Sequence, residues 1–199
     1  MPLGYSDASR RLQDRFDTRR LADRLVEVKV HHEFTDADRE FIQAQDKFFL
    51  ATVDDQGQPT CSYKGGDPGF VTILDPATLA FPNYDGNGMY LSMGNVSQTG
   101  RVGILFVDFE RQRRMRVDGV AELLFEPEVM ARYPQCQFVV RVRATAIYPN
   151  CPRYVHHYTL VERSPFVPKR EVEPPTPEWK RSDWARDVLP ARDRGKTQP

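Results

Sequence analysis

The sequence has few cysteines, no net charge and no long apolar run. Its three cysteines show no C-x-x-C spacing and are odd in number, which argues against a disulfide framework or a metal site and favours a reducing cytoplasm. The 28 basic residues balance 28 acidic ones, so no general attraction to nucleic acid is expected. No apolar run approaches the roughly 20 residues of a membrane span, and the N-terminus lacks the apolar core of a signal peptide. We therefore expect a cytoplasmic protein without metal, nucleic-acid or membrane partners.

The residues that are present fit one globular domain with extensions at both ends. Hydrophobic residues make up 40% of the 199 residues and charged residues 28%, as is usual for a soluble protein with a real core. Residues 1–46 are predicted to be a helical extension, because residues 6–30 carry apolar residues at helical spacings. Thr35 followed by Asp38 resembles a capped helix start.

From Lys47 onward the apolar pattern changes to a period of two. Phe48–Val53 is predicted to be a strand with two apolar faces, followed by a turn at Asp54–Gly57. Further strands are expected up to Ile147, among them Gly88–Met93 and a short strand that ends at Pro82. Six or seven strands at near-hairpin spacing predict a mainly β fold, a small antiparallel barrel over residues 47–160 with flanking helices.

The remaining residues, 161–199, differ in composition. Seven of the 16 prolines follow Leu160, so long regular elements are excluded there. The same segment holds both tryptophans, Trp179 and Trp184, which a purely disordered tail rarely does. We expect a proline-rich arm that packs on the barrel or on a second subunit.

Glycine-rich and basic motifs interrupt the predicted strands. Lys64–Gly66 could present one ammonium and backbone N–H groups to a phosphate, or could be a simple bulge. Gly86-Asn87 and Gly94-Asn95 supply turns, and the Asn95 amide could contact a ligand. In the basic run that follows, Arg114 and Arg116 lie in a strand and could reach a phosphate or a partner subunit.

Cysteine and histidine give weaker signals. Cys151 precedes a proline, and it is interpreted either as a redox-active thiol or, preferably, as a buried structural residue. The pairs His31-His32 and His156-His157 are adjacent in sequence, so their side chains diverge and no metal site is predicted.

Four of these segments together carry a family resemblance: Ala51–Pro59, Gly88–Asn95, Arg101–Phe106 and Arg116–Glu122. In order and spacing they resemble the pyridoxamine 5′-phosphate oxidase-like, FMN-binding split-barrel superfamily. Gly65–Val71 and the two Gly-Asn motifs resemble a branch known as predicted flavin-nucleotide-binding proteins. The resemblance implies an antiparallel split barrel and a homodimer with FMN at the subunit interface.

The resemblance also implies positions for cofactor contacts. Phe70–Thr72 would pass the flavin ring, Gly94-Asn95 would contact it, and Ser97-Gln98 would fall at the phosphate. The sequence departs from the oxidase pattern because it lacks the Arg-Lys phosphate clamp and a C-terminal arginine motif, and because Arg114 replaces a glutamine. Vitamin B6 oxidation is therefore not expected. The candidate cofactor-binding residues are Lys64, Gly65, Gly66, Phe70, Val71, Thr72, Asn87, Met93, Gly94, Asn95, Ser97, Gln98, Arg114 and Arg116.

These observations lead to an expected function with open alternatives. We expect an FMN-dependent oxidoreductase that acts on a small-molecule redox substrate, with the flavin carrying the redox chemistry. No catalytic side chain can be named. The alternatives are a non-catalytic flavin-binding module and a split barrel that binds another cofactor, haem or a deazaflavin.

Overall fold

The computed structural model of the chain describes residues 4–193. The chain forms two compact units, one within residues 1–161 and the other within residues 162–199. Residues 1–3 and 194–199, at the outer ends of the predicted extension and arm, lie outside the described residues. No helix among residues 4–193 combines the length and apolarity that crossing a membrane requires.

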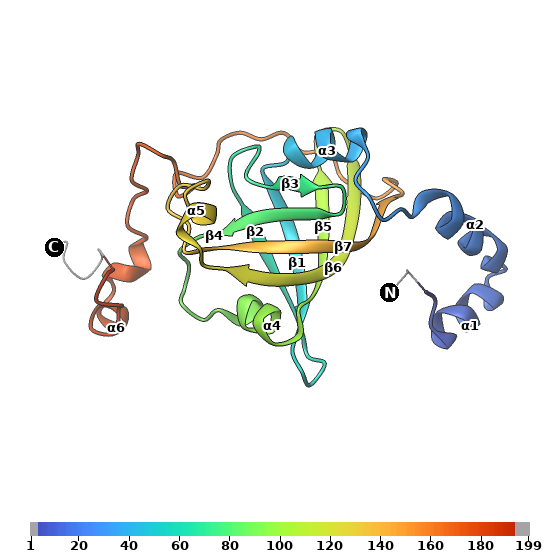
Figure 1. The fold of residues 1–199 in the computed structure, drawn as a ribbon, viewed down its shortest axis with the longest axis horizontal. Helices are drawn as coiled ribbons and strands as arrows, with labels where there is room; N and C mark the ends of the chain where they lie inside the picture. Colours follow the sequence, from blue (N-terminus) through green and yellow to red (C-terminus); the bar gives the residue numbers. More distant parts are fainter. Residues whose placement is uncertain (1–3, 194–199) are drawn as a thin grey trace. The chain divides into compact units, whose positions relative to one another are not determined.

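The first unit is built on one curled sheet of seven strands (Figure 1). The strands are β1 (Lys47–Val53), β2 (Pro59–Gly65), β3 (Thr72–Asp75), β4 (Thr78–Asn83), β5 (Arg101–Asp108), β6 (Arg113–Leu124) and β7 (Phe138–Asn150). Their order is β2-β1-β5-β6-β7-β4-β3, and every neighbouring pair is antiparallel. The predicted fold class, a mainly β, six- to seven-stranded antiparallel barrel with flanking helices, is confirmed.

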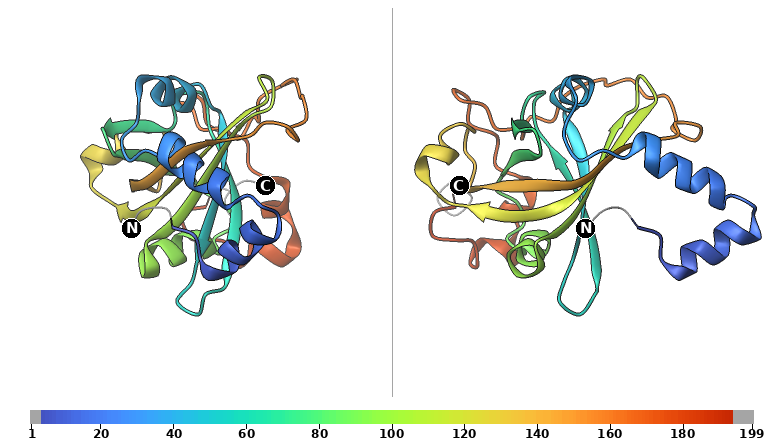
Figure 2. Two further views of the ribbon diagram at one scale, coloured as in Figure 1. Left: turned by 90° about the vertical axis from the view of Figure 1, so that its right-hand side faces the viewer. Right: turned by 45° about the vertical axis from the view of Figure 1, so that its right-hand side comes forward.

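Helices flank the sheet at several points, and only some of them contribute to its core. The helices of this unit are α1 (Asp7–Arg15), α2 (Arg19–Lys29), α3 (Asp36–Gln43), α4 (Leu91–Thr99) and α5 (Pro127–Met130). Helix α3 buries Phe41 and Ile42, and α4 buries Met93 and Val96. Helices α1 and α2 bury none of their residues and project from the barrel as a helical hairpin (Figure 2).

The core of the barrel is centred on Phe48. Its fully buried ring lies 4.8 Å from the ring centroid of Phe81, 5.5 Å from that of Phe106 and 5.7 Å from that of Phe70. The period-two pattern of β1 places Phe48, Leu50 and Thr52 in this core. The opposite face is more open, since Ala51 is exposed, so β1 is fully buried on one face rather than on two.

One predicted strand is wrong. Gly88–Met93 is not a strand, because the chain loops as far as Tyr90 and then forms helix α4. Gly88 and Tyr90 have φ angles of 77° and 51°, in the left-handed region that breaks an extended chain. Met93 and Val96 are buried three residues apart, which is a helical spacing.

The strand expected to end at Pro82 also differs, since β4 continues to Asn83. Pro82 pairs with Val139 of β7. On the other edge of β4, the last recorded pair with β3 is Thr72 with Ala80. Pro82 therefore lies where one edge of the strand has no neighbour, and its missing N–H leaves no ladder partner unsatisfied.

The start of helix α3 gives a first testable prediction. Thr35 Oγ1 accepts a hydrogen bond from the Asp38 N–H, and the Asp38 carboxylate accepts from the Thr35 N–H, which confirms the predicted cap. We expect Thr35→Ala to lower the free energy of unfolding by about 1 kcal/mol. Thr18, the N-cap residue of α2, makes no side-chain capping bond, so Thr18→Ala serves as the control. Equal losses in the two variants, measured by urea unfolding, would contradict this account.

The second unit has ordered contacts of its own. It contains the 3₁₀ helix η1 (Glu178–Arg181) and the short helix α6 (Asp183–Arg186). The rings of Trp179 and Trp184 stack with centroids 6.0 Å apart, and Lys180 Nζ lies 2.6 Å from Asp193 Oδ2 in a largely buried ion pair. The segment therefore has local structure of its own. Its docking on the barrel or on a second subunit stays a prediction.

Candidate functional site

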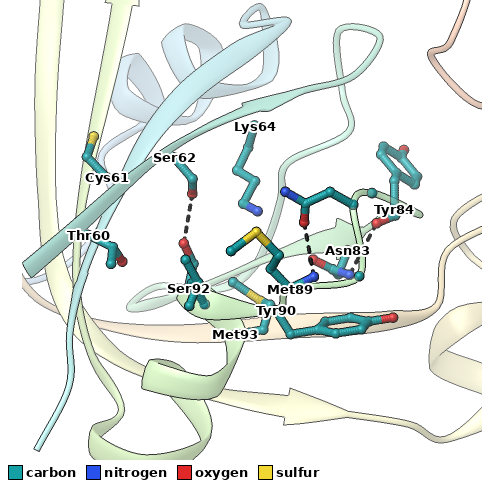
Figure 3. A pocket seen from close by; sticks show the side chains of 14 residues that line it. Thr60, Cys61, Ser62, Lys64, Asn83, Tyr84, Met89, Tyr90, Ser92 and Met93 are labelled. Atoms are coloured by element: carbon teal, nitrogen blue, oxygen red, sulfur yellow. Dashed lines mark hydrogen bonds between the residues drawn. The ribbon is translucent and has the colours of Figure 1, made fainter. Parts of the chain in front are cut away.

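A cavity of ≈ 350 Å³ lies between β2 and the segment that leads into α4 (Figure 3). Two stretches of chain line it, one from β2 and one from the end of β4 to the first turn of α4. The lining residues are Thr60, Cys61, Ser62, Lys64, Asn83, Tyr84, Gly86, Asn87, Gly88, Met89, Tyr90, Leu91, Ser92 and Met93. Its volume falls in the range of small-molecule sites.

The loop over the cavity is held by Gln137, the residue that precedes β7. The Gln137 side-chain oxygen accepts hydrogen bonds from Asn83 Nδ2 at 3.1 Å and from the Tyr90 hydroxyl at 3.0 Å. Its amide nitrogen donates to Asp85 Oδ1 at 3.0 Å. Within the loop, Asn87 Oδ1 accepts from the Met89 N–H. These bonds connect both ends of the loop to Gln137.

The first turn of α4 presents free backbone donors at the cavity. Tyr90, the N-cap residue, has a left-handed conformation and makes no side-chain cap, and the first turn holds no acidic residue. The first intrahelical bond runs from the Gly94 N–H to the Tyr90 carbonyl. Helix geometry therefore leaves the N–H groups of Leu91, Ser92 and Met93 without intrahelical acceptors, and such a helix start attracts anions.

Lys64 brings a cation to the same cavity. Figure 3 shows its side chain extending from β2 into the space beside Met89. Lys64 is half-buried, and this burial lowers its pKa below the usual value. Among residues 4–193, no carboxylate forms an ion pair with it. A partly desolvated cation without a counter-charge is stabilised by a bound anion.

The rest of the lining combines apolar surface with hydroxyl groups. Burial, with a smaller effect from Cys136, raises the pKa of Tyr84 to about 12, so its phenol stays protonated and can donate a hydrogen bond. The Ser92 hydroxyl donates to Ser62 at 3.1 Å and ties α4 to β2. Met93 is buried, and Met89 is exposed. The cavity thus offers a flat, partly apolar ligand both apolar contacts and hydrogen bonds.

Three predicted cofactor-binding residues line this cavity: Lys64, Asn87 and Met93. The sequence reasoning missed most of the others. A signal for some of them was present, because Thr60, Ser62 and Lys64 alternate along β2 and so share one face. No such signal marked Tyr84 and Tyr90. They reach the cavity from the segment that leads into α4, part of which was predicted to be the strand Gly88–Met93.

The predicted group from Gly65 to Thr72 does not line the cavity. Phe70 and Val71 are buried in the core, and the Thr72 hydroxyl accepts a hydrogen bond from Tyr133. The Gly66 N–H donates to the Asp46 carbonyl at 2.9 Å, and a Cβ at this position would meet the Phe70 ring at 2.4 Å. Glycine is thus required at position 66 by packing, and its amide is already engaged. Gly65 ends β2 opposite Lys47.

The predicted residues in the body of α4 dock the helix on the sheet. Asn95 Nδ2 donates to the hydroxyls of Thr52 at 3.1 Å and Thr60 at 3.4 Å. Gln98 Nε2 donates to Asp55 Oδ2 at 2.7 Å in the β1–β2 turn. Gly94 and Ser97 are exposed on the same helix. Contact of these four residues with a cofactor stays a prediction.

The two predicted arginines of β6 lie away from this cavity. Arg116 is exposed. The Arg114 Nε donates to the Cys151 carbonyl at 2.9 Å, and Arg114 lines a second cavity described below. Cys151 is exposed, so the preferred interpretation of a buried structural cysteine is wrong. Its pKa is lowered by hydrogen bonds from Arg153, whose Nε lies 3.2 Å from the sulfur.

The curled antiparallel sheet and its side cavity define a small barrel with a cavity of the size of a small-molecule site. Residues 34–165, more than half of the chain, match the family described as Pyridoxamine 5'-phosphate oxidase. The chain belongs to this family, and its fold is the split barrel that the sequence resemblance implied. No curated protein gives a match to the chain.

Several solved structures are similar to the chain at low sequence identity. HupZ of Group A Streptococcus is 22% identical, with 63% of this chain and 99% of HupZ covered and a TM-score of 0.48. An FMN-binding protein from Syntrophomonas wolfei is 16% identical, with 70% and 96% covered and a TM-score of 0.46. HutZ of Vibrio cholerae, described as a heme storage protein, is 19% identical, with 56% and 87% covered and a TM-score of 0.37. At such values these similarities carry no argument about the ligand.

Proposed function

We propose that the protein binds FMN in the cavity between β2 and α4. The observation that carries this proposal is the Lys64 ammonium, which is half-buried, has a lowered pKa and faces the cavity without an ion-pair partner among the described residues. Family membership supports a flavin as the ligand. The FMN phosphate supplies the anion that Lys64 lacks, and Lys64 and the start of α4 take the place of the missing Arg-Lys clamp.

The remaining lining residues would position and shield the flavin. Met89 and Met93 offer apolar surface to the ring, and the protonated Tyr84 phenol and the Asn87 amide offer hydrogen bonds. FMN, when bound, supplies one- and two-electron redox chemistry. The chain would thus act as an FMN-dependent oxidoreductase on a small-molecule substrate. A reducing cytoplasm suits its three free thiols.

The cofactor proposal is tested by titrating the full-length protein with FMN and with riboflavin, followed by flavin fluorescence. We expect FMN to bind at least about tenfold more tightly, because riboflavin lacks the phosphate. Equal affinity for the two flavins would place the phosphate outside the reach of Lys64. If neither FMN nor riboflavin binds, the proposal that FMN is the cofactor is wrong. Turnover of NADH or NADPH with an electron acceptor then separates an enzyme from a flavin-binding module.

The hydrogen bonds around Gln137 give a second prediction for this site. Replacing Gln137 by alanine removes the acceptor of Asn83 and Tyr90 and the donor to Asp85. The loop of the variant would lose more conformational entropy when FMN binds. We therefore expect FMN affinity to fall by about three- to tenfold. Gln56→Ala, in the exposed β1–β2 turn, is the matched control. An unchanged affinity in Gln137→Ala would mean that the loop does not contact the flavin.

We also propose that the protein acts as a homodimer, as its family membership suggests. Large apolar side chains that are exposed in one protomer are consistent with this: Tyr63 is 60% exposed on β2, and Phe16 is 68% exposed just after α1. Light scattering of the eluting full-length protein is expected to give twice the mass of the 23.0 kDa chain. A monomer mass at all concentrations would contradict the dimer.

A further inference from the structure

A second cavity of ≈ 410 Å³ shares no lining residue with the first. Four parts of the chain meet there: the end of α2, the first turns of α3, the start of β6 and the end of β7. Phe41, Met115 and Pro149 are among the residues of its apolar lining. Its size again falls in the range of small-molecule sites.

Three cations line this cavity: Lys29, Arg113 and Arg114. None of them forms an ion pair within residues 4–193. Arg113 lies over the Phe41 ring, with 5.2 Å between its guanidinium carbon and the ring centroid. The Nε of Arg114 donates a hydrogen bond to the Cys151 carbonyl. The outer N–H groups of its guanidinium remain available to bind an anion.

The one carboxylate of the cavity, Asp38, offsets only part of this charge, because it is a single anion among three cations. The Asp38 oxygen Oδ2 accepts hydrogen bonds from the Thr35 N–H and hydroxyl, and it lies 2.7 Å from His31 Nε2. It is thus engaged within its own helix start. The cavity retains an excess of positive charge above an apolar lining.

A further polar group points to a missing ligand. The side-chain oxygen of Asn150 is buried and has no hydrogen-bond partner in the part of the chain that the structure describes. Asn150 lines this cavity. Buried polar atoms almost always have a partner, so a ligand with a hydrogen-bond donor would satisfy this oxygen.

We propose that this second cavity binds a small organic anion, with a carboxylate, sulfonate or phosphate group attached to an apolar body that carries a hydrogen-bond donor such as a hydroxyl group. The anionic group pairs with Arg113, Arg114 and Lys29, and the body packs on Phe41 and Met115. This site is separate from the proposed flavin cavity and does not depend on it. It also gives Arg114 a ligand other than the FMN phosphate.

The test is calorimetric titration of the full-length protein with 6-hydroxy-2-naphthalenesulfonate, whose hydroxyl group supplies the hydrogen-bond donor, with and without saturating FMN. We expect one probe per chain in both cases. Arg114→Gln is expected to weaken binding about tenfold. Ala37→Trp places a large side chain at an exposed lining position and is expected to abolish binding. The matched controls are Arg101→Gln, on β5, and Glu40→Trp, on α3 outside the cavity, which should both bind as the parent does.

Lys64→Gln separates this site from the flavin cavity, because it should impair FMN binding and leave probe binding unchanged. Absence of probe binding, or binding that survives both Arg114→Gln and Ala37→Trp, would overturn the proposal. The proposal would also be overturned if FMN displaced the probe and Ala37→Trp lost FMN binding. The second cavity would then be part of the flavin site.

Discussion

Replacing Lys64 by glutamine is expected to weaken FMN binding by about 10- to 100-fold. The substitution keeps the length of the side chain approximately and removes the only unpaired cation among the residues that line the cavity. A charge-assisted hydrogen bond to phosphate contributes about 1.5–3 kcal/mol, which corresponds to that range of affinity. Fluorescence titration of the purified variants measures the effect.

The affinity should also depend on pH in a defined direction. Burial lowers the pKa of Lys64, so the unliganded protein loses this charge at a lower pH than an exposed lysine would. FMN affinity is therefore expected to fall as the pH rises through this lowered pKa. Lys64→Gln should remove that part of the pH dependence. Arg101→Gln, an exposed cation on β5, is the control for a general loss of positive charge.

Truncation of Phe48 to alanine is expected to lower the free energy of unfolding by about 3–5 kcal/mol. Phe48 is fully buried, and its ring contacts those of Phe70, Phe81 and Phe106 from three separate segments. The substitution would leave a cavity at the centre of the barrel, which the surrounding strands can close only in part. Urea unfolding of the purified variants measures the loss.

Phe49 provides the matched control, because it is the next residue of β1 and points to the other face. Phe49 is half-buried and stacks edge to face with the exposed Tyr63. Phe49→Ala is expected to cost about 1 kcal/mol in the isolated protomer. If the two substitutions cost the same, β1 does not have the one fully buried face described above. A larger cost for Phe49→Ala that rises with protein concentration would instead indicate a dimer interface on this face.

The barrel could be predicted because its strands alternate in polarity and are separated by turn residues. The pattern from Phe48 to Val53 predicts the strand, but both of its faces are apolar in sequence, so the pattern alone does not identify the face of Phe48 and Leu50 as the buried one. Helix α4 could not be predicted in this way. Its apolar residues Leu91 and Met93 are two apart, as in a strand, and Gly94 lowers its helix propensity. What fixes the helix is tertiary packing, since Met93 and Val96 insert into the core.

The site could be predicted only in part for the same reason. Lys64 was accessible to sequence reasoning, because a lysine beside two glycines at the end of a strand is a plausible phosphate ligand. The residues around it were not, since Tyr84, Tyr90 and Ser92 reach the cavity through the loop and the helix start. Gly66 and Phe70 looked like ligand contacts in the sequence, but each is explained by their packing on one another.

The central claim is that the family barrel of this chain holds FMN. The most direct test is the visible absorption spectrum of the purified full-length protein, combined with mass spectrometry of any chromophore that it releases on denaturation. The account predicts a yellow protein, or a colourless one that becomes yellow with added FMN, and release of one FMN per chain. A haem spectrum, a deazaflavin mass, or a colourless protein that ignores added FMN would contradict it.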